Sequence, residues 1–121
     1  MKIRRVVTGH DAAGKAVVEI DGICGEVTSL RPGHRSCGPW SEPGVTFRII
    51  EYQPGVAPRR HRTSTTDYAV VLSGEIEMEL DDGVTVKLRQ GDALVQRGTI
   101  HNWVNRGSEP CVLVGVLLSA V

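Results

Sequence analysis

A chain of 121 residues with 40% hydrophobic side chains can enclose one hydrophobic core, and we expect a single domain. Its 14 basic and 14 acidic side chains balance, so no strongly basic surface indicates a nucleic-acid partner. No apolar run reaches the length of a membrane-spanning helix, so we expect no membrane partner either.

The N-terminal third is predicted to form two strands followed by a long loop. Short apolar segments at residues 3–8 and 16–20 are separated by polar turn residues, which is typical of two adjacent strands. Seven glycine and proline residues interrupt residues 24–44, so we expect a loop without a long strand there. Trp40 lies in this loop. Its indole could plug the mouth of a barrel, or belong to a lid that contacts a ligand.

The rest of the chain shows the short alternating runs of β-strands, bounded by glycine, proline and aspartate turns. Asp82 and Gly83 are typical of a hairpin turn. On the two strands of this hairpin, alternation places the glutamates at 75, 77 and 79 on a solvated face, opposite Lys87 and Arg89, and places Ile76, Met78, Leu80, Val84, Val86 and Leu88 on the core side. We predict strands at residues 45–52, 61–72 (one short strand and one buried strand), 74–80, 84–88, 93–95, 101–105 and 111–118.

The first stretch with candidate functional residues begins at Gly55 and ends at Gly74. Gly55, His61, Asp67 and Gly74 fit the spacing of the first cupin motif, in which a glycine is followed by His-x-His, a glutamate and a second glycine. Thr63 stands where that motif has its second histidine, and Asp67 stands where it has glutamate. The stretch therefore resembles a cupin motif with two of its metal-binding positions changed.

A second stretch of similar design follows. Gly91, Gly98, His101 and Asn105 fit the second cupin motif, although the interval after Gly91 is one residue shorter and Gln96 replaces the proline of the motif. The chain thus resembles the cupin family over its middle and last thirds. Since cupins carry out many different reactions, the resemblance indicates the fold more specifically than the chemistry.

The resemblance implies an all-β fold, the double-stranded β-helix (the jelly-roll or cupin barrel), which the short alternating strands also favour. We expect residues 1–121 to form a single cupin domain. Its core barrel would lie at about residues 45–118, with the N-terminal strands and loop at residues 1–44.

His61, Asp67 and His101 are predicted to converge in one pocket as the catalytic residues. Two imidazoles and a carboxylate can form a facial triad for a divalent metal and leave coordination positions open. The resemblance implies iron, manganese, nickel or zinc on these three ligands. In a pocket without metal, the same residues could serve as general acid and base, with Asp67 orienting an imidazole, or simply form hydrogen bonds.

Other residues are predicted to surround a small-molecule ligand. Arginine recognises carboxylates through its planar fork, so Arg97, together with Gln96, is a candidate ligand contact. Tyr52 and Trp103 would equally suit the lining of the barrel. The arginines at 59 and 60 are expected on a solvated rim, and the one at 62 is expected to point away from the pocket. The candidate ligand contacts are Trp40, Tyr52, Thr63, Gln96, Arg97 and Trp103.

The resemblance implies a small-molecule enzyme, assisted by a metal, that acts on a carboxylate- or carbonyl-bearing metabolite. Decarboxylases, isomerases, dehydratases and dioxygenases are the expected reaction classes. The alternative is a non-catalytic cupin that binds a small ligand with a degenerate metal site, which Thr63 favours. We also expect a homodimer, since cupins are often dimers and the apolar last strand offers an interface, although that strand would equally suit the core.

Three cysteines, Cys24, Cys37 and Cys111, show no spacing typical of a metal site. We expect free, reduced thiols and hence a cytoplasmic protein; a bridge between Cys24 and Cys37 is the less favoured alternative. The N-terminus has a basic start but no long apolar segment or cleavage site, which favours a mature sequence without a signal peptide.

Overall fold

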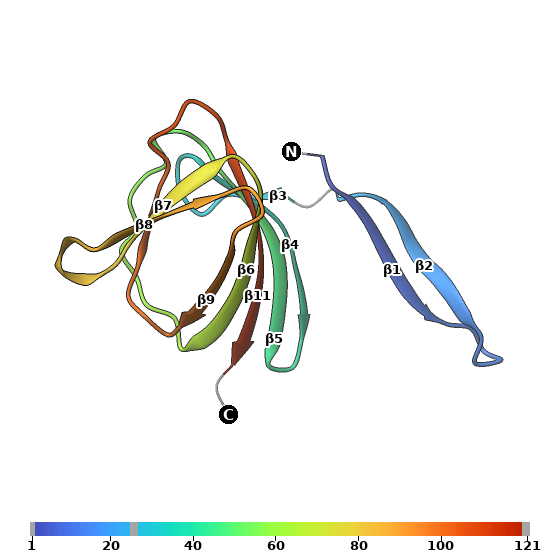
Figure 1. Cartoon of the computed structure of the whole chain (residues 1–121). Coiled ribbons are helices and arrows are strands. Elements are labelled where there is room, and N and C mark those ends of the chain that lie inside the picture. Colours follow the sequence, from blue (N-terminus) through green and yellow to red (C-terminus); the bar gives the residue numbers. More distant parts are fainter. Residues whose placement is uncertain (1, 25–26, 120–121) are drawn as a thin grey trace.

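The computed structural model describes residues 2–24 and 27–119 and is built from β-strands (Figure 1). Within this part the only other regular element is the 3-10 turn η1 (Asp81–Gly83), so the all-β prediction is confirmed. No helix in these residues is long and apolar enough to span a membrane. The strands are β1 (Arg4–His10), β2 (Ala16–Ile23), β3 (Val27–Thr28), β4 (His34–Glu42), β5 (Val45–Tyr52), β6 (Thr65–Ser73), β7 (Glu75–Glu79), β8 (Thr85–Arg89), β9 (Ala93–Arg97), β10 (Asn102–Val104) and β11 (Cys111–Ser119).

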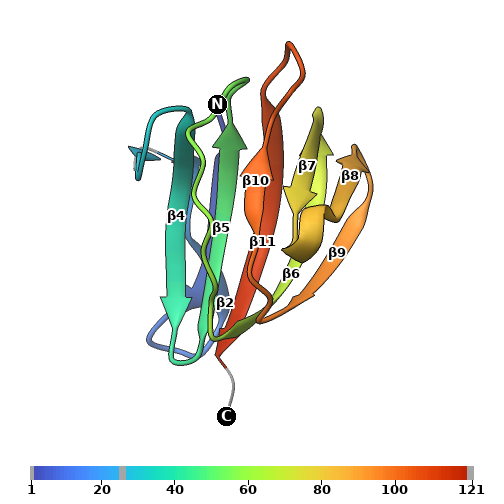
Figure 2. The ribbon, with the colours of Figure 1, turned by 90° about the vertical axis from the view of Figure 1, so that its left-hand side faces the viewer.

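Two antiparallel sheets form the barrel, and a separate hairpin stands beside it. The larger sheet has the strand order β3-β4-β5-β11-β6-β9, and the smaller one has the order β10-β7-β8. The two sheets lie face to face (Figure 2), and side chains from both, such as Leu113 and Met78, share one hydrophobic core. The hairpin β1–β2 pairs with neither sheet and projects away from the barrel in Figure 1.

Strand β5 shows which side of the larger sheet faces the interior. Its even-numbered residues Ile50 and Tyr52 belong to the core between the sheets. The odd-numbered residue Ile49 instead packs on the outer face, in a smaller cluster with Cys24 and Cys37. Because side chains alternate along a strand, every second residue of β5 points into the barrel.

The prediction of a loop over residues 24–44 was wrong, because this stretch contains the nine-residue strand β4, paired with β5. Gly38 and the proline that follows it do not end the strand. They occupy a bulge, where the register shifts between Cys37 and Trp40. After the bulge, Trp40 faces outward and stacks on Phe47, with ring centroids 5.4 Å apart. Trp40 therefore lies in a strand, on the outer face of the barrel wall.

The β7–β8 hairpin matches its prediction in part. Ile76, Met78 and Leu88 are buried, as expected. Val84 and Val86 were predicted to face the core but are 52% and 38% exposed. Strand β8 is an edge strand of the smaller sheet. Of Val84, Val86 and Leu88, only Leu88 belongs to the core, so alternation alone does not produce burial on this strand.

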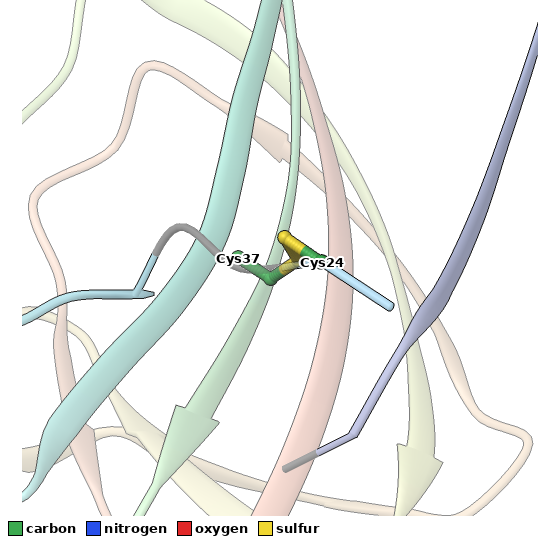
Figure 3. Close-up of a disulfide and its surroundings, with 2 residues drawn as sticks. All are labelled: Cys24 and Cys37. Carbon is green, nitrogen blue, oxygen red and sulfur yellow. A yellow bond between two sulfur atoms is a disulfide. The ribbon is translucent and has the colours of Figure 1, made fainter. Parts of the chain in front are cut away.

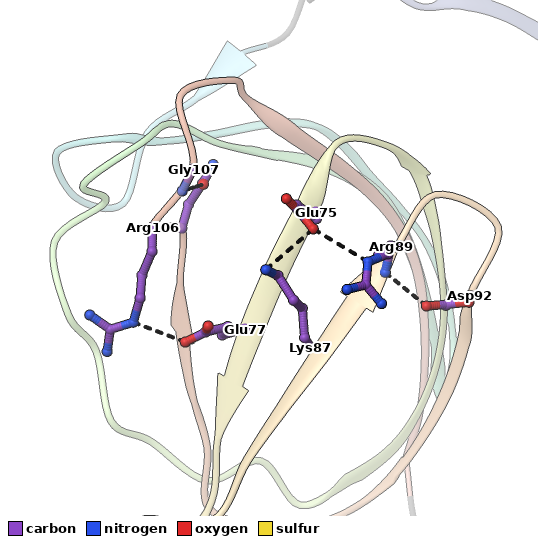
Figure 4. Close-up of polar contacts among 8 residues, drawn as sticks. Glu75, Glu77, Lys87, Arg89, Asp92, Arg106 and Gly107 are labelled. Carbon is purple, nitrogen blue, oxygen red and sulfur yellow. Dashed lines mark hydrogen bonds and ion pairs between the residues drawn. The ribbon is translucent and has the colours of Figure 1, made fainter.

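The predicted solvated face of this hairpin is confirmed (Figure 4). Glu75 lies 3.6 Å from both Lys87 and Arg89 on the neighbouring strand. Glu77 pairs with Arg106 at 2.9 Å. These side chains are wholly or partly exposed, and such ion pairs contribute little stability, about 0–1 kcal/mol each.

Cys24 and Cys37 form a disulfide (Figure 3), so the prediction of three free thiols was wrong. The Cα atoms of the two residues lie 6.3 Å apart, within the range of a disulfide. Sequence spacing could not show this, because β4 had to be identified as a strand before the side of Cys37 could be known. The bridge joins the end of the β1–β2 hairpin to the barrel wall. It also removes the argument from reduced thiols to a cytoplasmic location, which stays an untested prediction.

Thiol titration should therefore find one reactive thiol in the denatured, unreduced protein and three after reduction. The single thiol belongs to Cys111, which is buried in the core, and burial raises its pKa to about 11. In the folded protein it should react slowly, since the thiolate is the reactive form. A Cys111→Ala variant serves as the control and should show no reactive thiol before reduction. Three reactive thiols in the unreduced wild type would instead restore the original prediction.

Candidate functional site

His61 and His101 lie side by side in the barrel. The backbone N–H of His61 donates to the carbonyl oxygen of His101 at 3.0 Å, and the N–H of His101 donates to the carbonyl of His61 at 2.9 Å. The two ring centroids are 4.4 Å apart. His101 is buried and His61 is partly buried. The two histidines that the motifs predicted as partners are thus placed together by this short bridge, which we call the histidine pair.

Each imidazole of the histidine pair is held through its Nδ1 atom. His61 Nδ1 lies 3.0 Å from the carbonyl oxygen of Arg59, and His101 Nδ1 lies 2.9 Å from that of Thr99. Since a carbonyl oxygen can only accept a hydrogen bond, Nδ1 of His61 carries the hydrogen in its contact with Arg59. In the neutral ring, Nε2 then has the lone pair that can take a proton or bind a metal.

Gln96 approaches the same ring of His101 from strand β9. It is only 3% exposed, and its Nε2 atom lies 2.6 Å from Nδ1 and 3.2 Å from Nε2 of His101. One nitrogen of the neutral His101 ring always has a lone pair, and in either tautomer that nitrogen lies within reach of the Gln96 amide N–H. The Oε1 atom of Gln96 is buried without a hydrogen-bond partner in the described part of the chain. This predicted ligand contact therefore lies at the histidine pair and occupies one of its lone pairs.

Asp67 is the third predicted member of the site and sits opposite Gln96 in the β6–β9 register. Its carboxylate accepts a hydrogen bond from the hydroxyl of Thr65. Burial lowers the pKa of His101 below 6.5, and the charge of Asp67 opposes that shift only in part. We conclude that His101 is neutral at pH 7 and that Asp67 acts on it through space.

A divalent metal on the three predicted ligands does not fit this arrangement. No group of three or more His, Cys, Asp or Glu side chains between residues 2–24 and 27–119 is placed to hold an ion. Gln96 occupies the lone pair of His101, and Asp67 is bonded to Thr65. Thr63, at the position of the lost histidine, has a buried hydroxyl without a hydrogen-bond partner in these same ranges, and a neutral hydroxyl is a weak ligand. In this arrangement, Gln96 lies on His101 and Thr65 on Asp67, where a metal would have to bind.

A series of aromatic rings leads away from the histidine pair through the barrel interior. The ring of His101 lies 5.9 Å from that of Trp103, which in turn lies 5.9 Å from that of Tyr52. Tyr52 contacts His34 edge to face at 5.5 Å. Tyr52 and Trp103 are both buried and line the barrel, while the side chain of Arg97, another predicted contact, is exposed on β9.

His34 and Arg48 are interior polar residues that the sequence analysis did not select. His34 lay in the expected loop, where no face could be assigned. For Arg48 there was a signal: it lies two residues before Ile50 and four before Tyr52, so alternation places an arginine on the interior face of β5. A charged residue at a core position of a strand indicates a polar site.

Known proteins are similar to the part of this chain that holds the histidine pair. A family model for the cupin domain, Cupin_2, matches residues 48–117. Oryzines biosynthesis cluster protein J of Aspergillus oryzae is 45% identical over 62 residues, which cover 51% of this chain and 35% of that protein. The cupin-domain-containing oxidoreductase srdD of Neurospora crassa is 42% identical over 78 residues, covering 62% of this chain and 40% of that protein. The chain thus spans about two fifths or less of the length of these relatives.

Solved structures show the same fold. An RmlC-like cupin from Shewanella frigidimarina superposes with a TM-score of 0.67 at 19% identity, covering 78% of this chain and 84% of that chain. The Cupin_2 domain of an XRE family transcriptional regulator from Enterobacter cloacae gives a TM-score of 0.59 at 25% identity, covering 73% of this chain and 96% of that chain. These likenesses confirm the predicted jelly-roll barrel.

Proposed function

This chain belongs to the cupin family, and from that membership we propose that it is a small-molecule enzyme acting on a carboxylate- or carbonyl-bearing metabolite. The observation that carries the proposal is the histidine pair, in which Nδ1 of His61 is held by the carbonyl of Arg59 and the ring lies beside the neutral, buried ring of His101. Relatives named as oxidoreductases favour an enzyme over a binding protein. The proposal extends to the class of substrate, a metabolite that carries a carboxylate or a carbonyl group.

The residues at the site support proton transfer next to a carbonyl group. His61 removes a proton from the carbon beside the carbonyl; the C–H bond breaks, the N–H bond forms on Nε2, and the electron pair moves to the carbonyl oxygen as an enolate. Nδ1–H of His61 keeps donating to the carbonyl oxygen of Arg59, and this hydrogen bond stabilises the imidazolium that results. Gln96 donates one amide hydrogen to His101 and keeps its second for the enolate oxygen. Return of the proton to the enolate oxygen gives the enol isomer, and its return to the same carbon exchanges that hydrogen with solvent.

A non-catalytic ligand-binding cupin is the alternative, and two residues favour it. Thr63 and Gln96 stand where the two motifs have a histidine and a proline, and Gln96 already satisfies the lone pair of His101. A bound divalent metal would supply Lewis-acid polarisation of a carbonyl, but it would require Gln96 to leave His101.

Hydrogen exchange in heavy water tests the proposal. The wild-type protein should exchange protons next to the carbonyl of 2-oxo acids such as pyruvate, followed by NMR. His61→Gln should slow this exchange by about 10²–10⁴-fold, because it removes the base. The matched control Arg60→Gln alters an exposed side chain that pairs with Asp81 and should leave the rate unchanged. Pyruvate binding without exchange in the wild type would favour the binding protein, and equal exchange in wild type and His61→Gln would refute the role of His61.

The same assay, run after chelator treatment and again with added manganese, separates the metal-free reaction from a metal-assisted one. Manganese should bind the wild type weakly, and Thr63→His should bind it more tightly by adding an imidazole beside His61. Calorimetric titration measures both affinities. If exchange disappears with chelator and returns with manganese, the metal-free role of the histidine pair is wrong.

A further inference from the structure

A second polar group lies on the interior wall of the barrel, apart from the histidine pair. The β4–β5 register places His34 opposite Tyr52. Arg48 lies on the same interior face of β5, four residues before Tyr52, and Arg31 precedes β4 with its guanidinium 5.9 Å from the centre of the Tyr52 ring. We call Arg31, His34 and Arg48 the basic cluster.

The basic cluster holds buried hydrogen-bonding atoms that have no partner in the described residues. They are Nη2 of Arg31, Nδ1 of His34 and Nε of Arg48. His34 as a whole is only 3% exposed. Arg31 is nevertheless held firmly, because its Nε donates to the carbonyl oxygen of Ala57 at 2.8 Å. A buried polar atom without a partner costs about 1–3 kcal/mol, so three together at one place, two of them arginine donors, indicate a missing hydrogen-bonding group.

The charged groups that act on His34 are all arginines. After burial, the groups that lower the pKa of His34 to about 4 are Arg31, Arg48 and Arg59, so His34 is neutral at pH 7. Burial raises the pKa of the Tyr52 phenol, while Arg31 and Arg48 oppose that shift. No carboxylate is among the groups that act on His34, Tyr52 or Arg31. An anion is therefore the ligand that this part of the interior would favour, because charge interactions are strong where water is excluded.

The wall beside Arg48 carries small residues. Arg48 pairs with Gly115 on β11, and Gly115 pairs in turn with Ala69 on β6. Gly115 is buried, yet a Cβ atom added there would come no closer than 3.8 Å to any neighbour, Leu117 Cδ1. The glycine is therefore not required by close packing of the protein itself. A glycine inside a strand often marks a place where a ligand approaches the backbone.

We propose that Arg48, His34 and Arg31 form a subsite that binds the carboxylate of an organic acid inside the barrel. The planar fork of Arg48 suits a carboxylate, and the tautomer of His34 with its hydrogen on the unpartnered Nδ1 supplies a further donor. The rings of Tyr52 and Trp103 join this subsite to the histidine pair. The inference rests on the proposed function and narrows it: besides the carbonyl group that reacts at the histidine pair, the substrate carries a carboxylate at its other end, away from that carbonyl, which the basic cluster binds.

Titration of labelled protein with malonate, followed by NMR, tests the subsite. Malonate should shift the Nε–H signal of Arg48, while malonamide, which has the same shape without charge, should not. Arg48→Gln should weaken malonate binding by about ten- to a hundredfold, the range expected for a hydrogen bond to a charged group. Arg48→Lys keeps the charge but loses the planar fork, so its affinity for malonate should lie between those of the wild type and Arg48→Gln. The control Arg89→Gln changes an exposed arginine that pairs with Glu75 and should bind malonate like the wild type.

The outcomes separate this inference from the proposed function. Malonate binding that is equal in wild type and Arg48→Gln overturns the subsite, as does an absence of any shift at Arg48. If His61→Gln abolishes exchange while Arg48→Gln leaves both exchange and malonate binding intact, the enzyme stands and the subsite falls. If malonate binding depends on Arg48 but no acid undergoes exchange, the subsite stands and the enzyme falls. Equal shifts with chloride would show an adventitious ion only and would also overturn the subsite. Thermal unfolding of Arg48→Gln and Arg48→Lys confirms that each variant is folded.

Discussion

Replacing Gly74 with alanine should destabilise the protein by about 2–5 kcal/mol. Gly74 joins β6 to β7 with a φ of 76°, a backbone conformation that costs residues with a Cβ about 1–2 kcal/mol. A Cβ atom there would also lie 2.4 Å from the carbonyl oxygen of Pro110 and 3.0 Å from Cys111 Cα. Both are backbone atoms at the start of β11, so the strand itself would have to move.

Gly14→Ala is the matched control for this prediction. Gly14 lies in the β1–β2 turn with a φ of 77°, and a Cβ atom there would meet nothing within 4 Å. Alanine should therefore cost only the backbone term, about 1–2 kcal/mol. Urea unfolding of both variants measures the difference. Equal losses would show that the close approach to β11 adds nothing.

Stability should fall as the pH drops from 6.5 towards 4, and His34 should account for much of the loss. In the unfolded chain this histidine takes up a proton near pH 6.5, whereas in the fold its pKa is about 4 because of burial and then of Arg31, Arg48 and Arg59. Between these values the unfolded state binds a proton that the folded state does not. The full stabilisation is present above pH 6.5 and is lost as the pH falls to the folded pKa. The difference corresponds to about 3 kcal/mol.

His34→Phe should remove most of this pH dependence, because phenylalanine keeps a ring against Tyr52 but cannot bind a proton. Urea unfolding at pH 7 and pH 4.5 compares the wild type with the variant. We expect the gap between the two pH values to shrink by about 2–3 kcal/mol in His34→Phe. In His34→Phe, the lowered pKa of His101 should leave a smaller loss of stability as the pH falls. An unchanged gap would contradict the burial of a neutral His34.

Most strands could be predicted from alternation and turn residues. The errors lie where a neighbouring strand determines the structure or the burial of a residue. Residues 24–44 were expected to be a loop, because glycine and proline usually end strands; in β4 they form a bulge that β5 holds in place. Val84 and Val86 alternate like core residues, yet β8 is an edge strand and leaves them exposed. Local sequence determines the strand, and the position of that strand in the sheet determines what it buries.

The candidate site shows the same division. Motif spacing was enough to select His61 and His101, and the ring contact between them agrees with that choice. It could not show that Gln96 would turn its amide onto His101, since the two residues meet only after β9 has packed beside β6. Whether His101 is free to bind the metal predicted from the motifs therefore depends on its contact with Gln96, which motif spacing cannot reveal.

The sequence by itself determined the all-β class, the turn glycines and the two histidines, because each depends on short-range chemistry: alternation, positive φ and motif spacing. All four motif glycines, Gly55, Gly74, Gly91 and Gly98, do have positive φ. Only the tertiary structure decided that Gly74 lies against β11, that Cys24 meets Cys37 and that His34 and Arg48 share the barrel interior. The physical reason is register. A shift of one residue, or a bulge such as that at Gly38, moves every later side chain of a strand to the opposite face, and register is settled by the packing of whole strands.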